Sequence, residues 1–211
     1  KQLSSIEDEY KGVRQGTGVA DNRYSTHSQT AITTGSKIIV MSAAEVWFLR
    51  AEAALRNYTS ENVENCYKQG ITVSFAQWDA NGVSDYLESE ETPAAYVDAF
   101  DKKFDADAPT SITPKWDESA PLELKLERII TQKWLAIYPE GCEAWAEQRR
   151  TGYPQLIKVA VNNSGNTIST DDMIRRVFFN QDYKTDNKAL YDALVSKLGG
   201  ADNGGTRLWW D

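Results

Sequence analysis

The residues best suited to binding chemistry lie in a polar, glycine-rich stretch between positions 10 and 27. The candidates in this stretch are Arg14, Asn22, Arg23, Tyr24 and His27. Arginine and asparagine side chains form hydrogen bonds with hydroxyl groups, and aromatic rings stack on the apolar face of a sugar ring. The stretch therefore suits a hydroxyl-rich ligand, although its composition also fits a merely solvated loop.

The chain is rich in tryptophan, with seven in 211 residues. We expect most of them to anchor the core and a few to form stacking platforms. Trp116 is a candidate platform, because Pro109 and Pro114 make the sequence before it irregular.

The sequence offers few residues that could bind a metal ion or carry out covalent catalysis. His27 is the only histidine, which excludes a multi-histidine metal site and a histidine relay. Glycine-rich phosphate loops, paired CxxC motifs and calcium loops are absent from the sequence. The acidic pairs Asp105/Asp107 and Asp171/Asp172 lie in loop-like sequence, and nothing there places two carboxylates as glycoside hydrolysis requires. We expect no cofactor, no metal and no catalysis, with a carbohydrate-active enzyme as the remaining alternative.

Composition narrows the class of protein. A hydrophobic share of 41% and a charged share of 26% are those of an ordinary globular domain. The net charge of −8 argues against binding to nucleic acid or to an anionic membrane surface. The sequence has no apolar run long enough to span a membrane and begins without methionine or a signal segment. We therefore expect a fragment of a longer protein, with any export signal or lipid anchor outside this sequence.

Two cysteines, Cys66 and Cys142, are too few for a disulfide framework. Each is expected to behave as a small buried apolar residue. A single disulfide bond between them is the alternative.

Residues 42–78 are predicted to form an antiparallel helical hairpin. Ser42 and Glu45 have the spacing of a capping box, and Thr59-Ser60 is predicted to cap the second helix. Gly70 lies on the apolar face of that helix, where a missing side chain lets the two backbones approach. The hairpin is close to the tetratricopeptide period in length.

Residues 120–152 are predicted to form a helical corner. The apolar stripe of the first arm comprises Leu122, Leu126, Ile129, Ile130, Trp134 and Ile137. Tyr138-Pro139-Glu140-Gly141 ends this arm, and a short helix with Trp145 follows. We assign Arg149 and Arg150 to structure, as bidentate partners of carboxylates or carbonyls. Together with Ser42, Glu45, Trp134 and Trp145, they are the expected structural residues.

The remaining segments are less regular. Thr92-Pro93 is predicted to start a helix that carries Tyr96, Val97, Phe100 and Phe104. A small β-hairpin within 153–180 is left open. Asp186-Asn187 is predicted to cap a final helix ended by Gly199-Gly200, and Trp209 and Trp210 are expected to pack back onto the helices.

The predicted fold is mainly α, with a tetratricopeptide-like helical hairpin core, long irregular loops and at most a small β-hairpin. It is expected to be a single helical domain over 1–211, divided into a loop-rich segment (1–41), a hairpin (42–78), an excursion (79–119), a corner (120–152) and a C-terminal segment (153–211).

Three stretches together resemble the C-terminal part of the SusD/RagB family. They are SAAEVWFLRAEAA (42–54), IITQKWLA (129–136) and EAWAEQRRTGYP (143–154), and the terminal RLWWD (207–211) is similar as well. The sequence VFFNQ (177–181) departs from the short proline-containing apolar stretch usual in the family. The matched stretches are scaffold motifs, so they imply a fold and not the identity of a ligand.

This resemblance implies a surface lipoprotein of the outer membrane that binds oligosaccharides without catalysis. The expected partner is a SusC-type TonB-dependent transporter, to which the glycan is passed. An alternative that the helical hairpin itself suggests is a tetratricopeptide-like scaffold for protein–protein interaction.

Overall fold

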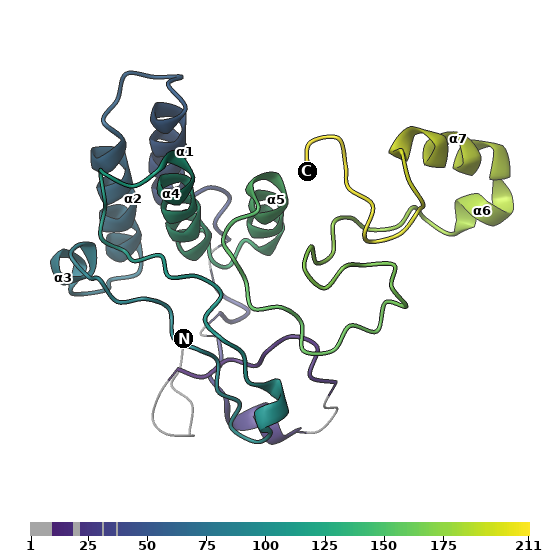
Figure 1. Ribbon diagram of the computed structural model, residues 1–211, viewed down its shortest axis with the longest axis horizontal. Coiled ribbons are helices and arrows are strands. Elements are labelled where there is room, and N and C mark those ends of the chain that lie inside the picture. Colours follow the sequence, from purple (N-terminus) through teal and green to yellow (C-terminus); the bar gives the residue numbers. More distant parts are fainter. Residues whose placement is uncertain (1–9, 19–21, 31, 37) are drawn as a thin grey trace. The chain divides into compact units, whose positions relative to one another are not determined.

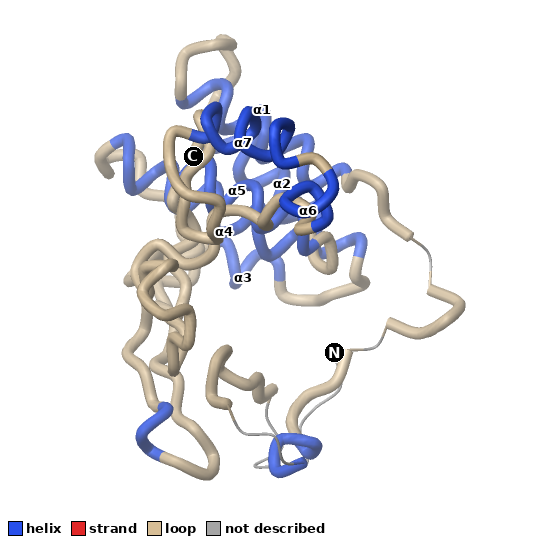
Figure 2. The backbone as a smooth tube through the Cα atoms, turned by 90° about the vertical axis from the view of Figure 1, so that its right-hand side faces the viewer, coloured by secondary structure: helices blue, strands red, loops and turns tan. Residues whose placement is uncertain are grey.

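A computed structural model of the chain describes residues 10–18, 22–30, 32–36 and 38–211. Its elements are the 3₁₀ helices η1 (Asn22–Thr26) and η2 (Lys102–Phe104) and the α-helices α1 (Ala43–Leu55), α2 (Val63–Gln77), α3 (Val83–Leu87), α4 (Leu122–Ala136), α5 (Gly141–Thr151), α6 (Asp182–Asp186) and α7 (Lys188–Leu198) (Figure 1). Among the described residues there is no strand (Figure 2), only an isolated antiparallel bridge between Tyr96 and Ala106. The mainly α fold predicted from the sequence is confirmed.

The chain divides into two compact units that are each discontinuous in sequence. The helical unit comprises residues 32–95 and 107–156, and the loop unit comprises residues up to 31, 96–106 and 157–211. The single domain expected from the sequence stays a prediction. Within the described residues, no helix has the length and apolar character to cross a membrane.

The predicted hairpin is present as α1 and α2, which pack against each other. The Ser42 hydroxyl accepts a hydrogen bond from the Glu45 backbone N–H at 3.0 Å, as the capping box requires. The cap of α2 is Asn62, whose side chain accepts from the Asn65 N–H at 2.8 Å. The prediction of Thr59-Ser60 as this cap was wrong, because the turn between the helices extends two residues further.

Gly70 makes room for an aromatic ring. A Cβ atom on Gly70 would lie 2.7 Å from Cε1 and Cζ of Phe48, and Phe48 is buried. The ring of Phe48 lies edge-on to Tyr67, with centroids 6.2 Å apart. The close approach expected at Gly70 is therefore made by a side chain of α1 and not by its backbone.

Helix α4 completes the core of the helical unit by packing on both α1 and α2. Leu126, Ile129, Ile130 and Ile137 of the predicted stripe are buried. Leu122 is exposed and Trp134 is half-buried, so the fully buried stripe begins at Leu126 and does not include Trp134. The contact of the corner with the hairpin, on which the predicted fold depends, is confirmed.

Helix α5 forms the second arm of the corner and ends at Gly152, which has a left-handed φ of 77°. The guanidinium of Arg149 lies 4.0 Å from the ring centroid of Trp145, a distance typical of a cation–π contact. Both cysteines are free, with Cys66 buried and Cys142 exposed.

The predicted helix from Thr92-Pro93 was wrong. Tyr96 and Ala106 exchange both backbone hydrogen bonds, at 2.8 and 2.9 Å, across a turn that contains η2. The Asp98 carboxylate accepts the N–H groups of Phe100 and Asp101 at 2.9 and 3.0 Å. A side chain that takes these N–H groups competes directly with helix formation.

In the loop unit, the segment 157–180 has no strand among its described residues, so the hairpin left open there is not formed. Arg176 pairs with the buried Asp202 carboxylate at 2.6 Å, and Asp202 also accepts from the Tyr191 hydroxyl of α7 at 3.1 Å. Asn187 caps α7 by accepting from the Leu190 N–H, as predicted.

The expected packing of Trp209 against the helices was wrong, because its side chain is 95% exposed. The last residues form a closed turn, in which the Leu208 N–H donates to the Asp211 carboxylate and the Asp211 N–H donates to the Leu208 carbonyl, both at 3.1 Å. This turn leaves the indole in solvent.

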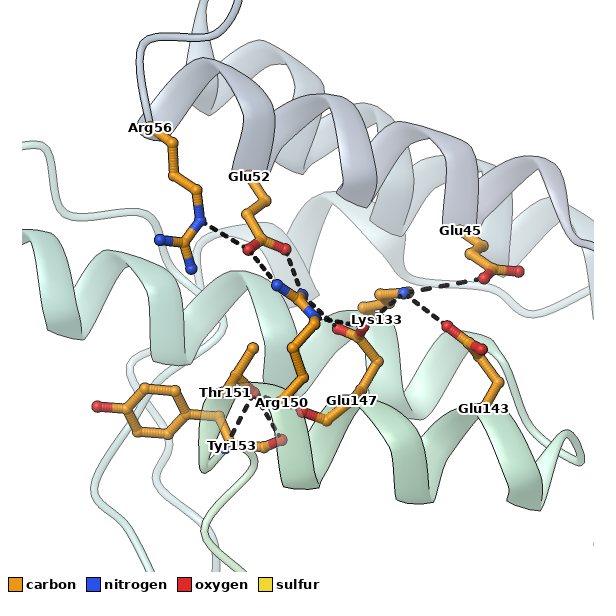
Figure 3. Close-up of polar contacts among 9 residues, drawn as sticks. All are labelled: Glu45, Glu52, Arg56, Lys133, Glu143, Glu147, Arg150, Thr151 and Tyr153. Carbon is orange, nitrogen blue, oxygen red and sulfur yellow. Dashed lines mark hydrogen bonds and ion pairs between the residues drawn. The ribbon is translucent and has the colours of Figure 1, made fainter. Parts of the chain in front are cut away.

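Helices α1, α4 and α5 meet through buried charges (Figure 3). The ammonium group of Lys133 on α4 is 1% exposed and lies 3.1 Å from Glu143, 3.3 Å from Glu147 and 3.8 Å from Glu45. Burying an ammonium group without anionic partners costs several kcal/mol, by order of magnitude. The three carboxylates from two other helices therefore fix where α4 lies.

Arg150 continues this ionic cluster. Its Nη1 and Nη2 atoms donate to the two carboxylate oxygens of Glu52 at 2.8 and 2.6 Å, which is a bidentate pair (Figure 3). Arg150 also donates twice to Glu147 at 3.0 Å, and Arg56 donates to Glu52 at 2.8 Å. We call Glu45, Glu52, Arg56, Lys133, Glu143, Glu147 and Arg150 the ionic cluster.

The pKa values of two carboxyl groups in this cluster are shifted in opposite directions. Burial alone raises the pKa of Glu52, but the hydrogen bonds from Arg150 and Arg56 outweigh it, so the pKa lies below its usual 4.5. Burial raises the pKa of Glu45, and Lys133 opposes this only partly. The difference follows from geometry, because Glu52 receives direct guanidinium hydrogen bonds whereas Lys133 lies 3.8 Å from Glu45.

We expect Gly70→Ala to lower the free energy of unfolding by about 1–2 kcal/mol, because overpacking against Phe48 exceeds the gain in helix propensity. Gly141→Ala is the matched control, since Gly141 is also helical but has open space where its Cβ would lie. Urea denaturation of both variants measures the difference. Equal effects of the two substitutions would contradict the role assigned to Gly70.

We expect Glu52→Gln to destabilise the fold by about 2 kcal/mol at neutral pH, because it leaves Arg150 without its bidentate partner. Since the pKa of Glu52 is lowered on folding, its carboxylate stabilises the fold above pH 4.5 and loses this effect as the pH falls through the folded pKa. The difference between wild type and variant should therefore shrink in acid. Glu64→Gln, which breaks an exposed pair with Lys68, is the control and should change the free energy of unfolding by less than about 0.5 kcal/mol.

Candidate functional site

The structure brings Tyr24 and His27 together with an aromatic residue from a distant part of the sequence. The Tyr24 ring lies edge-on to His27, with centroids 5.0 Å apart, and edge-on to Phe100, with centroids 5.3 Å apart. The His27 and Phe100 centroids are 6.0 Å apart. These three rings, all in the loop unit, are here called the aromatic cluster.

Asp98 holds the aromatic cluster in place. Its carboxylate accepts hydrogen bonds from the hydroxyls of Tyr24 and Tyr96, at 3.1 and 2.9 Å. It also accepts the two backbone N–H groups of the Phe100 turn. Asp98 therefore joins η1 to the 96–106 turn.

The electrostatics of Asp98 do not suit a general acid. Burial raises the pKa of its carboxyl, but the four donors outweigh burial and hold the pKa below its usual 3.8. The acid of a glycosidase needs a raised pKa, so that it still carries a proton near neutral pH. Asp98 is ionised there and serves as a hydrogen-bond acceptor.

Phe100 is the member of the aromatic cluster that faces solvent. It is 43% exposed, whereas His27 is 6% exposed and Tyr24 is half-buried. Tyr24 contacts the Phe100 ring edge-on, and His27 is tilted by 31° to it. A ring held by two neighbours and still partly open to solvent is a suitable stacking partner for the apolar face of a sugar. The arrangement can bind such a face without large rearrangement.

Arg14 has a structural position in the same unit. Its Nε donates to the Lys158 carbonyl at 2.9 Å, and its Nη1 donates to the carbonyls of Phe104 and Asp105 at 3.0 and 2.9 Å. Arg14 thus ties three segments of the loop unit together. The backbones of Asn22 and Arg23 form part of η1, and the structure does not describe their side chains.

Trp116 belongs to the core of the helical unit. It is 8% exposed, its ring lies 5.1 Å from that of Tyr67, and its indole N–H donates to Glu118 at 2.9 Å. Little of the ring is left for a ligand. We therefore correct its assignment from stacking platform to core residue.

Sequence reasoning missed Asp98, Tyr96 and Phe100 as site residues, because it assigned their segment to a helix. One available signal is the spacing of Asp98 from Phe100 and Asp101, which is that of an aspartate accepting from N–H groups two and three residues later. No local sequence pattern indicates that Asp98 pairs with Tyr24, which lies more than 70 positions away.

The helical unit has a groove of about 540 Å³ over the ionic cluster. Leu49 and Ala53 of α1 supply apolar surface, and Glu52, Lys133 and Arg150 supply charged surface. Among the residues that the structure describes, no cluster of histidine, cysteine, aspartate and glutamate could hold a metal ion.

The sequence model of the SusD-like family, described as "Susd and RagB outer membrane lipoprotein", matches residues 1–211. No curated protein matches the chain significantly.

Solved structures of SusD homologues are similar to the chain. A homologue from Bacteroides vulgatus is 46% identical with a TM-score of 0.90, and the match covers 100% of this chain and 45% of the homologue. A homologue from Bacteroides thetaiotaomicron is 36% identical with a TM-score of 0.91, over 97% of this chain and 45% of the homologue. A chitin-binding SusD homologue from Flavobacterium johnsoniae is 46% identical with a TM-score of 0.78, over 82% of this chain and 36% of the homologue. The chain thus spans less than half the length of these homologues.

The match to the family model and the similarity to solved structures indicate the same family. The family model covers the whole chain, and homologues at 46% and 36% identity share its helical arrangement. The resemblance expected from residues 42–54, 129–136 and 143–154 is confirmed. The chain belongs to the SusD-like family of SusD and RagB outer-membrane lipoproteins.

Proposed function

We propose that the protein is a non-catalytic oligosaccharide-binding subunit of an outer-membrane nutrient uptake system. The observation that carries this proposal is membership of the SusD-like family, together with 46% identity to a chitin-binding homologue. In this role the protein captures a glycan and passes it to a SusC-type TonB-dependent transporter. It lies on the cell surface, held by an N-terminal lipid anchor.

We further propose that residues 1–211 are the C-terminal part of a longer protein. The coverage of only 45% and 36% of the homologues supports a longer protein, and the resemblance of residues 42–54, 129–136 and 143–154 supports its C-terminal part. Binding experiments are therefore designed for the full-length protein.

The aromatic cluster is the proposed glycan contact in the loop unit. Phe100 offers its exposed ring surface to the apolar face of a sugar, while Tyr24 contacts that ring edge-on and the tilted His27 ring lies next to it. Asn22 and Arg23, in η1 beside Tyr24, are the proposed hydroxyl-binding residues. Arg14 supports this surface by fixing the segments around it.

Calorimetry with a panel of soluble oligosaccharides tests the function. We expect at least one glycan to bind, with no release of reducing sugar on prolonged incubation. Binding to peptides and to none of the glycans would contradict the proposal. Release of reducing sugar would favour a carbohydrate-active enzyme instead.

A second candidate function is a scaffold for protein–protein interaction, favoured by the groove over the ionic cluster. Concave surfaces of helical repeats commonly take peptides. Peptide binding that Leu49→Ala weakens would support this function.

We expect Phe100→Ala to weaken binding of the glycan by about fivefold to tenfold, because an aromatic contact contributes roughly 1 kcal/mol or more. Phe178→Ala is the matched control, since Phe178 is also an exposed phenylalanine of the loop unit, at 54% exposure. Calorimetry on both variants, with thermal unfolding as a check of folding, gives the comparison. Equal losses in the two variants would remove Phe100 from the site.

A further inference from the structure

Two aromatic side chains of the helical unit contact each other at the surface, outside its core. Trp78 is the C-terminal cap of α2, and Tyr138 directly follows Ile137, the C-terminal cap of α4. Their ring centroids are 6.3 Å apart, and the rings are inclined at 51°. Trp78 is 48% exposed and Tyr138 is 39% exposed.

The exposure of this pair contrasts with its surroundings. Ile71 on α2 is 2% exposed and Ile137, directly after α4, is 3% exposed, so both helices also have an interior face. The two rings are carried by helices that pack against each other. Rings inclined in this way bound a corner, in which a pyranose can contact one ring with its face and the other with its edge.

A small pocket of about 90 Å³ is lined by residues of α1, α2, α3 and α4, among them Ser74 and Ala136, which shortly precede Trp78 and Tyr138 in the sequence. Ile71, Phe75 and Ala136 give it apolar walls, and Ser74 and Gln132 give it polar groups. The Gln132 amide is held in place by a hydrogen bond of 2.9 Å to the Tyr86 hydroxyl. Since a water molecule occupies about 30 Å³ in the liquid, the pocket has room for a substituent of a few heavy atoms.

The lining of the pocket indicates which substituent fits. A hydroxymethyl group is polar at its end and gains little from apolar walls. An acetamido group has a methyl group for the apolar walls and an amide that can hydrogen-bond to a hydroxyl or a carboxamide. The combination of aromatic pair and pocket therefore matches an N-acetylated sugar better than an unsubstituted one.

We propose that the C-terminal ends of α2 and α4 form a sugar-binding site, in which Trp78 and Tyr138 contact a pyranose ring and the adjacent pocket takes its acetamido group. This inference rests on the proposed glycan-binding function and names a ligand class, oligosaccharides that contain N-acetylhexosamine. The site uses no residue of the aromatic cluster.

Two trisaccharides test the site, because they share a β-1,4 backbone and differ in the acetamido group. Calorimetry on the full-length protein compares tri-N-acetylchitotriose with cellotriose. We expect the acetylated sugar to bind more tightly, and Trp78→Ala to weaken its binding about tenfold. Trp78→Phe, which keeps a ring, should retain most of the affinity.

Two further variants separate the aromatic pair from the pocket. Ser74→Leu fills the pocket and should remove the preference for the acetylated sugar. Tyr183→Ala is the control for a lost aromatic ring, because Tyr183 is exposed to a similar extent as Tyr138, 41% against 39%, and should leave the affinity unchanged. Thermal unfolding shows that each variant is folded.

The outcomes separate this site from the proposed function. Equal affinity of the wild type for the two trisaccharides, or unchanged affinity in Trp78→Ala, overturns the site. Glycan binding that depends on Phe100 and not on Trp78 overturns the site and leaves the proposed function in place. A wild type that binds no glycan of the wider panel overturns both.

Discussion

The arrangement of the helical unit depends on the ionic cluster that joins α1, α4 and α5. Lys133 is almost completely buried, and its charge is offset by carboxylates that come from α1 and α5. Arg150 connects the same helices by its bidentate pair with Glu52. Buried charges tolerate few geometries, because moving one helix leaves a charge without its partner. The apolar core of α1, α2 and α4 supplies hydrophobic burial, and we infer that the cluster selects the register in which α1, α4 and α5 meet.

The loop unit is held by a different kind of contact. Its segments are joined by backbone hydrogen bonds, such as those between Tyr96 and Ala106, and by side chains that satisfy further backbone groups. Arg14 donates to three carbonyls of distant segments, and Asp98 accepts two N–H groups and two tyrosine hydroxyls. Irregular backbone fixed in this way can display a ring such as Phe100 in a defined orientation. This is the physical basis for placing a proposed glycan contact on loops.

Family membership and surface chemistry contribute separately to the functional conclusion. The SusD-like family determines the class of protein. Exposed aromatic rings occur at two places on the described surface. Phe100 lies beside Tyr24 in the loop unit, and Trp78 lies beside Tyr138 in the helical unit. In both settings a neighbouring ring fixes the orientation of the exposed one, and such preorganisation lowers the entropy lost on binding. A protein that binds extended oligosaccharides can use more than one such contact.

The sequence by itself determined the longer helices, the caps at Ser42 and Asn187, and the family. The capping box at Ser42, the apolar stripe around Ile129 and Ile130, and the stop at Gly152 are local patterns that depend on neighbouring residues in the chain. Tertiary structure decided the burial of Trp116, the exposure of Trp209, and the turn that replaced the helix after Thr92. It also decided the ionic cluster and the pairing of Asp98 with Tyr24. These features join residues far apart in sequence, and no periodicity of one segment shows which distant charge or hydroxyl will face it.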